Sequence, residues 1–189
     1  MIRPRIRTAG FTIIELLTVV AIAAILIAVA APSFTEFLAK RRVEGTTSEL
    51  VTDIQFARSE AVSHNAPVRM TFGTDCYVLH SGGVSLSATA VTCTRTSKNL
   101  PTGVTEIKTV QLDPGRPVTI EPGTVACFEF EPVRGTTDSG SPCGLGGTVN
   151  VRATSGTQWQ LRSVLTLMGR VETCLPGSAP YFAGWKPCT

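Results

Sequence analysis

The sequence predicts an α+β protein in which one long amino-terminal helix packs against antiparallel β-sheet. An apolar run, Phe11–Ala31, passes without a clear break into an amphipathic helical pattern that continues to about residue 66. Beyond Pro67 the hydrophobic period changes from about four to two. The alternating segments are short and are separated by loops rich in Gly, Pro, Ser and Thr rather than by helices, which favours antiparallel pairing.

The first ten residues carry three arginines, Arg3, Arg5 and Arg7, and end in Gly10. An ordinary secretory signal has its apolar core before the cleavage site and loses it on processing. Here the apolar segment follows the leader, so we expect a removable leader at residues 1–10 and a retained helix at residues 11–32. The 21 residues of Phe11–Ala31 are long enough to cross the hydrocarbon core of a membrane, about 30 Å.

Glu15 lies near the start of this apolar segment. An ionisable side chain inside a membrane costs roughly 2.5 to 3.5 kcal/mol at the bilayer centre, so it marks a functional position and needs a partner. The alternative is a plain single-pass anchor with an incidental acid. That alternative does not account for a glycine, a phenylalanine and a glutamate at the spacing of Gly10, Phe11 and Glu15.

Residues 33–66 are predicted to continue the helix into a globular head. Pro32 predicts a kink. The stripe Leu50, Ile54, Ala57 and Ala61 recurs at helical spacing and is predicted to close the core of the sheet. The helix is predicted to end within residues 64–67, because the residue before a proline avoids the helical region.

Residues 67–189 are predicted to form the β-rich head. The strands that the alternation predicts are Val68–Phe72, Cys76–His80, Val118–Ile120, Val125–Phe130, Thr148–Ala153 and Gln158–Thr166.

Six cysteines all lie beyond the apolar segment, and none forms a C-x-x-C pair: Cys76, Cys93, Cys127, Cys143, Cys174 and Cys188. An even number of dispersed cysteines in an exported head indicates disulfides in an oxidising compartment, whereas zinc sites normally show close pairs. Six cysteines allow 15 connectivities, and the sequence leaves them open. We favour sequential pairing over other connectivities, and expect no metal site and no catalytic thiol.

The charge balance does not predict a nucleic-acid-binding protein. Without the leader the chain has 14 basic and 14 acidic residues, and beyond Ala66 it has 10 basic and 8 acidic residues. No phosphate loop, dinucleotide fingerprint, nucleophile elbow or H-E-x-x-H motif is present. We therefore expect a protein that is not an enzyme and has no cofactor.

The amino-terminal pattern resembles the signal of type IV pilins and type II secretion pseudopilins. This resemblance implies cleavage by prepilin peptidase between Gly10 and Phe11, and N-methylation of the new Phe11 amine. It also implies that Glu15 pairs with the amine of a neighbouring subunit, whether a major or minor pilin or a pseudopilin. The expected location is the inner membrane, single-pass with the head in the periplasm, and then the pilus or pseudopilus.

The helical stretch Glu49–Val62, followed by Asn65 and Pro67, resembles the GspH/FimT family of minor pilins and pseudopilins, as does Val164–Val171. The resemblance implies a type IV pilin-like fold and a minor structural subunit of a pilus tip or initiation complex. Major pilins share the amino-terminal motif, and the block Ala57–Ala61 favours the minor class. A GspH-like pseudopilin of type II secretion remains an alternative.

The second alternative is a minor pilin that binds DNA in natural transformation. Some FimT-like members do so through a Gly-Arg-x-Arg motif, where this chain has Gly169-Arg170-Val171-Glu172. Replacing the second arginine by glutamate removes one phosphate contact and adds repulsion. Arg152, Arg162 and Arg170 are the residues that would contact DNA if they clustered, but we expect them to lie on solvated strand edges.

Overall fold

The computed structural model describes residues 10–73, 75–82, 90–113, 115, 117–123, 126–137, 143–144, 146–154 and 158–188. The chain divides into two compact units, Met1–Phe37 and Leu38–Thr189. One helix, α1 (Ile13–Ser63), begins in the first unit and ends in the second. Pro32 lies inside this helix, and the kink expected there stays a prediction.

In the second unit α1 buries one face and exposes the other. The predicted stripe of Leu50, Ile54, Ala57 and Ala61 is completely buried. Val43 and Ala39 extend the stripe toward the start of the unit. These positions recur every three or four residues, which keeps them on one side of a helix.

The helix ends where the sequence predicts, and Asn65 provides the reason. Its φ is 47°, in the left-handed region that asparagine tolerates better than most residues. The Ala66 amide donates to the Ala61 carbonyl at 3.2 Å and the Asn65 amide to the Val62 carbonyl at 3.4 Å, which is the Schellman pattern. Pro67 then prevents further helix.

The strands form two four-stranded antiparallel sheets and a short hairpin. The first sheet has the order β5-β2-β1-β7, with β1 at Val68–Gly73, β2 at Cys76–Gly82, β5 at Val104–Gln111 and β7 at Cys127–Phe130. The second has the order β10-β9-β8-β6, with β6 at Val118–Pro122, β8 at Gly147–Ala153, β9 at Gln160–Leu165 and β10 at Val171–Cys174. The hairpin joins β3 (Thr92–Cys93) and β4 (Lys98–Asn99).

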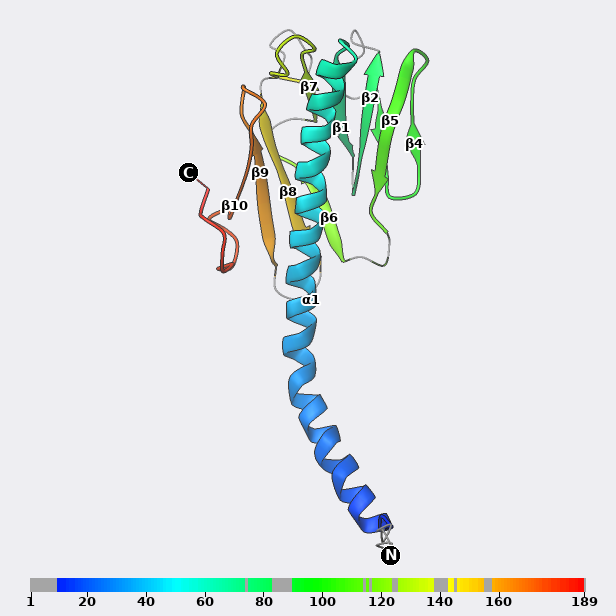
Figure 1. The fold of residues 1–189 in the computed structure, drawn as a ribbon, viewed down its shortest axis with the longest axis vertical. Coiled ribbons are helices and arrows are strands. Elements are labelled where there is room, and N and C mark those ends of the chain that lie inside the picture. Colours follow the sequence, from blue (N-terminus) through cyan, green and yellow to red (C-terminus); the bar gives the residue numbers. More distant parts are fainter. Residues whose placement is uncertain are drawn as a thin grey trace, which may run out of the picture. The chain divides into compact units, whose positions relative to one another are not determined.

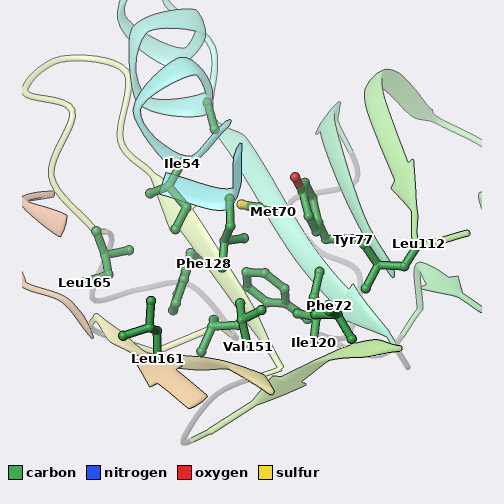
Figure 2. Packing of buried hydrophobic residues seen from close by; sticks show 14 of the residues in the cluster. Ile54, Met70, Phe72, Tyr77, Leu112, Ile120, Phe128, Val151, Leu161 and Leu165 are labelled. Atoms are coloured by element: carbon green, nitrogen blue, oxygen red, sulfur yellow. The ribbon is translucent and has the colours of Figure 1, made fainter. Parts of the chain in front are cut away.

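Within this second unit, α1 runs over both sheets in Figure 1 and one hydrophobic core joins all three. Figure 2 shows Ile54 of α1 above Met70 and Phe128 of the first sheet, with Leu161 of the second sheet on the far side. Phe72 and Phe128 meet edge to face, with ring centroids 5.2 Å apart. Fully burying each such side chain contributes roughly 1.5 to 3 kcal/mol, so the sheets and the helix stabilise one another.

Four strands of the described structure were not predicted: the two-residue strands β3 and β4, and the strands β5 and β10. β5 alternates poorly because charged Glu106 and Lys108 interrupt its apolar residues, while β10 is a short edge strand of four residues. The predicted end of the second strand at His80 was also wrong, because Ser81 and Gly82 continue β2 and pair with β5. Of the strand predicted to begin at Val125, the structure describes residues 126–130, and Val125 lies outside the described residues.

Candidate functional site

The amino-terminal start of α1 is built by Thr12. Its hydroxyl accepts a hydrogen bond from the Glu15 amide at 3.3 Å, and its carbonyl accepts from the Leu16 amide at 3.1 Å. Thr12 is therefore the N-cap, and Glu15 occupies the third position of the first turn, as in a capping box. This cap was not predicted, although a threonine followed three residues later by a glutamate is its sequence signal.

Two features of the position of Glu15 bear on its carboxylate. It is the acidic residue of the first turn, where the positive end of the helix dipole favours an anion. It is also exposed, and within the described part of the chain its carboxylate has neither a hydrogen bond nor an ion pair. A partner for the Glu15 carboxylate thus has to come from outside these residues.

The helix around Glu15 presents apolar side chains on every side. Five of these side chains are each more than half exposed in the single chain: Phe11, Ile14, Leu17, Ile25 and Val29. By length and composition this is a helix that could cross a membrane, and none of the most apolar window is buried in the protein. A helix that is apolar all round needs lipid or other helices around it.

The three arginines considered for DNA contact come from the second sheet. Arg152 on β8 and Arg162 on β9 alternate with buried neighbours, so both lie on the face turned away from the core. Arg152 lies 3.7 Å from Glu121 and Arg162 donates its Nε to Asn150 at 3.0 Å. The structure therefore places Arg152 and Arg162 on one face, with polar partners from adjacent strands.

Arg170 lies apart from that pair, in the turn that joins β9 to β10. Its side chain is 75% exposed, and one Nη lies 3.1 Å from a carboxylate oxygen of Glu172. The residue that replaces the second arginine of the Gly-Arg-x-Arg pattern is thus the ion partner of the first. This pairing reduces the positive charge that Arg170 presents to a polyanion.

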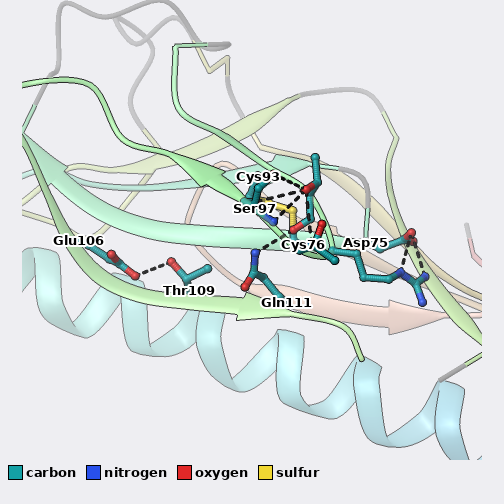
Figure 3. The surroundings of a disulfide bond; sticks show 10 residues. Asp75, Cys76, Cys93, Ser97, Glu106, Thr109 and Gln111 are labelled. Atoms are coloured by element: carbon teal, nitrogen blue, oxygen red, sulfur yellow. Dashed lines mark hydrogen bonds and ion pairs between the residues drawn. A yellow bond between two sulfur atoms is a disulfide. The ribbon is translucent and has the colours of Figure 1, made fainter. Parts of the chain in front are cut away.

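Three disulfides close loops of similar length in the head. They join Cys76 to Cys93, Cys127 to Cys143 and Cys174 to Cys188, the sequential pairing favoured above, with sequence separations of 17, 16 and 14. Loops of this size constrain the unfolded chain by about 3 kcal/mol each. Figure 3 shows the first disulfide between β2 and β3, beside Asp75 and Ser97.

His80 is one of the buried titratable side chains of the described head. His80 on β2 is completely buried, its Nε2 lies 3.1 Å from the Thr71 hydroxyl, and burial together with the nearby Arg69 lowers its pKa to about 4. His64 is exposed and lies 3.2 Å from Glu60. Within the described residues, no three His, Cys, Asp or Glu side chains gather as a metal site would require.

Comparison with known proteins identifies the family. Residues 46–169 match the family described as Type II transport protein GspH. The chain belongs to this family. Residues 5–31 also match the prokaryotic N-terminal methylation motif, which covers the leader and the apolar segment. No curated protein sequence matched the chain significantly.

The fold resembles that of a solved minor pilin. A crystal structure of the type IV minor pilin FimU from Pseudomonas aeruginosa strain PAO1, in space group P21, superposes with a TM-score of 0.51 at 16% identity, covering 76% of this chain and 96% of that chain. A second FimU structure, in space group P65, superposes with a TM-score of 0.47 at 17% identity and covers 72% and 96%. The first superposition shows the same long helix with antiparallel sheets.

Membership of the GspH family and the methylation motif make this chain a minor pilin or pseudopilin. Such proteins are structural subunits that act together with other pilins or pseudopilins. The methylation motif and the exposed apolar part of α1 indicate a membrane-anchored subunit.

Proposed function

We propose that this chain is an inner-membrane minor subunit that joins the initiation or tip complex of a type IV filament, with its head in the periplasm before assembly. Prepilin peptidase cleaves between Gly10 and Phe11, and the new Phe11 amine is methylated. The retained helix then serves first as the membrane anchor and later as the part of the subunit that packs inside the filament. Family membership and the methylation motif support this proposal.

The observation that carries the proposal is the position of Glu15 in a capped first turn. Thr12 fixes where the helix begins, so the carboxylate lies a constant distance from the amino terminus that cleavage creates. In apolar surroundings an unpaired carboxylate is costly, and a methylated amine from an adjacent subunit neutralises it. Pairing succeeds only when two helices have the right axial offset, so the ion pair sets the register of assembly.

The ion pair between Glu15 and a methylated amine would serve in a pilus and in a pseudopilus alike, so the two alternatives differ only in their partner subunits. The matched family is described by its type II transport member, whereas the solved structure with the similar fold is a type IV minor pilin. We propose a place in the minor-subunit complex for either filament. The DNA-binding alternative is not favoured, because Glu172 pairs with Arg170 where a second arginine would sit.

Two measurements on protein isolated from its native envelope test this proposal. Mass spectrometry of the amino-terminal peptide should find methylated Phe11, and affinity recovery in mild detergent should retrieve other subunits with the N-terminal methylation motif. An intact Met1, a cut near Ala31, or recovery without any such subunit contradicts the proposal. The identity of the recovered partners distinguishes a pilus from a secretion pseudopilus.

A further inference from the structure

Exposed apolar side chains gather on the head where α1 ends. Val62 in the last turn of α1 is 49% exposed, Val133 in the loop after β7 is 72% exposed, and Leu167 and Met168 in the β9–β10 turn are 51% and 71% exposed. We call these four residues the α1-end patch. Figure 1 shows the β9–β10 turn at the same end of the head as the close of α1.

Contacts between the three segments bring the patch together. The Thr137 amide donates to the Leu167 carbonyl at 3.1 Å, which joins the loop after β7 to the β9–β10 turn. A guanidinium nitrogen of Arg58 lies 3.5 Å from the Gly169 carbonyl, which joins that turn to α1. A Cβ at Gly135 would lie 3.2 Å from a methyl group of Val62, so the loop also touches the last turn of the helix.

Two glycines make this close approach possible. Gly135 and Gly169 have φ values of 62° and 73°, in the left-handed region that favours glycine. A Cβ at Gly169 would lie 2.5 Å from the Gly135 carbonyl oxygen, so no other residue fits without moving the backbone. Backbone contacts therefore fix the loop after β7 against the β9–β10 turn, and the patch residues on these two segments keep their relative positions.

The exposed apolar surface calls for a partner. Burying a side chain of this size contributes roughly 1.5 to 3 kcal/mol, and a contiguous exposed apolar surface with a polar border marks an interaction site. Leu167 and Met168 are exposed in the isolated subunit, so the free energy of burying them is gained only when a partner covers them. A preformed surface also loses little conformational entropy on binding.

The charges at the border indicate the chemistry of the partner. Arg58 and Arg134 adjoin the patch, whereas Arg170 is paired with Glu172. Arg134 is exposed and has no hydrogen bond or ion pair among the described residues. A two-fold contact between two copies of the patch would bring like charges together, because each copy presents the same residues. A different protein with an apolar surface bordered by carboxylates fits better.

We propose that the α1-end patch is the docking surface for another subunit of the filament, one that presents an apolar surface bordered by carboxylates. This inference rests on the proposed function, in which the chain assembles with other subunits that carry the N-terminal methylation motif. The patch continues directly from α1, since Val62 belongs to its last turn.

Site-specific photo-crosslinking of the full-length chain in its native envelope tests the surface. A benzophenone amino acid at Met168 or at Val133 should give an adduct with a different subunit that carries an N-terminal methylation motif. The matched control is the same probe at Tyr181, which is 80% exposed but belongs to the loop closed by Cys174 and Cys188, and it should not give that adduct. Adducts only with a second copy of this chain, with lipid or with DNA overturn the proposal.

Charge substitutions give a second, independent readout. Met168→Glu and Val133→Glu should each lower recovery of the partner subunit at least tenfold, whereas Tyr181→Glu should leave it unchanged. Membrane level and leader cleavage, measured for every variant, separate loss of docking from failure to fold. The proposed docking surface is wrong, and the proposed function stands, if the wild-type chain is cleaved and recovered with filament subunits and the Met168→Glu and Val133→Glu variants are recovered equally well. Both proposals fail if the wild-type chain is not recovered with filament subunits.

Discussion

The hydroxyl of Tyr77 donates a hydrogen bond to a carboxylate oxygen of Asp53 at 2.8 Å, and this bond connects β2 to α1 inside the head. Asp53 is buried, and its second carboxylate oxygen lies 2.6 Å from Nζ of Lys108 on β5. Burial, and the neighbouring Asp53 carboxylate that accepts the phenolic proton, raise the pKa of Tyr77 far above its ordinary value. One helical carboxylate thus holds two strands of the first sheet.

Removing this hydroxyl should weaken the head measurably. We expect Tyr77→Phe to lower the free energy of unfolding by about 1.5 to 3 kcal/mol, because a buried charged acceptor loses a donor. Chemical denaturation of the mature chain in detergent, followed by near-ultraviolet circular dichroism, measures the change. The matched control is Tyr181→Phe, which removes an exposed hydroxyl and should change the free energy by less than about 0.5 kcal/mol. Equal effects of the two substitutions would show that the Asp53 bond contributes nothing.

His80 should make the head less stable in acid. Its pKa is lowered from 6.5 to about 4 in the folded protein, so the unfolded chain binds more protons than the folded one between these two values. Stability therefore rises with pH across this window, and protonation costs roughly 3 kcal/mol by pH 4 at about 1.4 kcal/mol per unit. The groups that face His80 are Thr71 and Arg69 on β1 and Glu106 on β5, with Glu129 on β7 held to Arg69 at 2.8 Å.

The His80 contribution can be isolated by comparing slopes. We expect His80→Gln to flatten the dependence of unfolding free energy on pH between 4 and 6.5, whatever it does to stability at pH 8. The matched control is His64→Gln, which removes an exposed histidine and leaves His80 in place, so the part of the slope that His80 contributes should remain. A wild-type slope in the His80 variant would show that His80 is not the source of the acid sensitivity.

The helix was predictable because its signals are local. The stripe from Leu50 to Ala61 has the helical period, and Asn65 and Pro67 end the helix through their own backbone preferences. The strands with clean alternation, β1 and β8, were predictable for the same reason. β5 was not, because Lys108 pairs with Asp53 across 55 residues and no local pattern reveals that a charged residue faces a buried partner.

Part of the candidate site could likewise be predicted from local sequence, and part could not. Glu15 was identifiable because a carboxylate in an apolar segment stands out within a few residues. The α1-end patch was not identifiable, since Val62, Val133 and Met168 are brought together by contacts between segments far apart in the sequence, such as those of Gly135 and Gly169. The partnership of Arg170 with Glu172 is also local, but its geometry depends on the β9–β10 turn.

DNA binding by the purified chain should be weak or undetectable at physiological salt. Arg170 is paired with Glu172, and affinity for a duplex scales with the number of phosphates that cations neutralise. Glu172→Arg should strengthen residual binding, most visibly at low ionic strength, whereas Glu172→Gln should strengthen it less because it removes repulsion without adding a contact. Electrophoretic mobility shifts over a series of salt concentrations measure both. Tight binding by the wild-type chain that is lost on Arg170→Ala would instead support the DNA-receptor alternative.

Glu15→Ala should separate assembly from insertion. The substitution removes a polar group from the apolar segment, so insertion into the membrane should become easier and the level of protein there should not fall. Thr12 still caps the helix through its hydroxyl and the amide at position 15, so the start of α1 should be preserved. Incorporation into filaments, or capture by partner subunits, should fall at least tenfold because the helix has no charged group to set its register. Glu15→Asp is the matched variant, since it keeps the charge and shortens its reach, and it should retain part of the incorporation. Normal incorporation of Glu15→Ala would show that the carboxylate does not direct assembly, and loss of that variant from the membrane would assign Glu15 to insertion or stability instead.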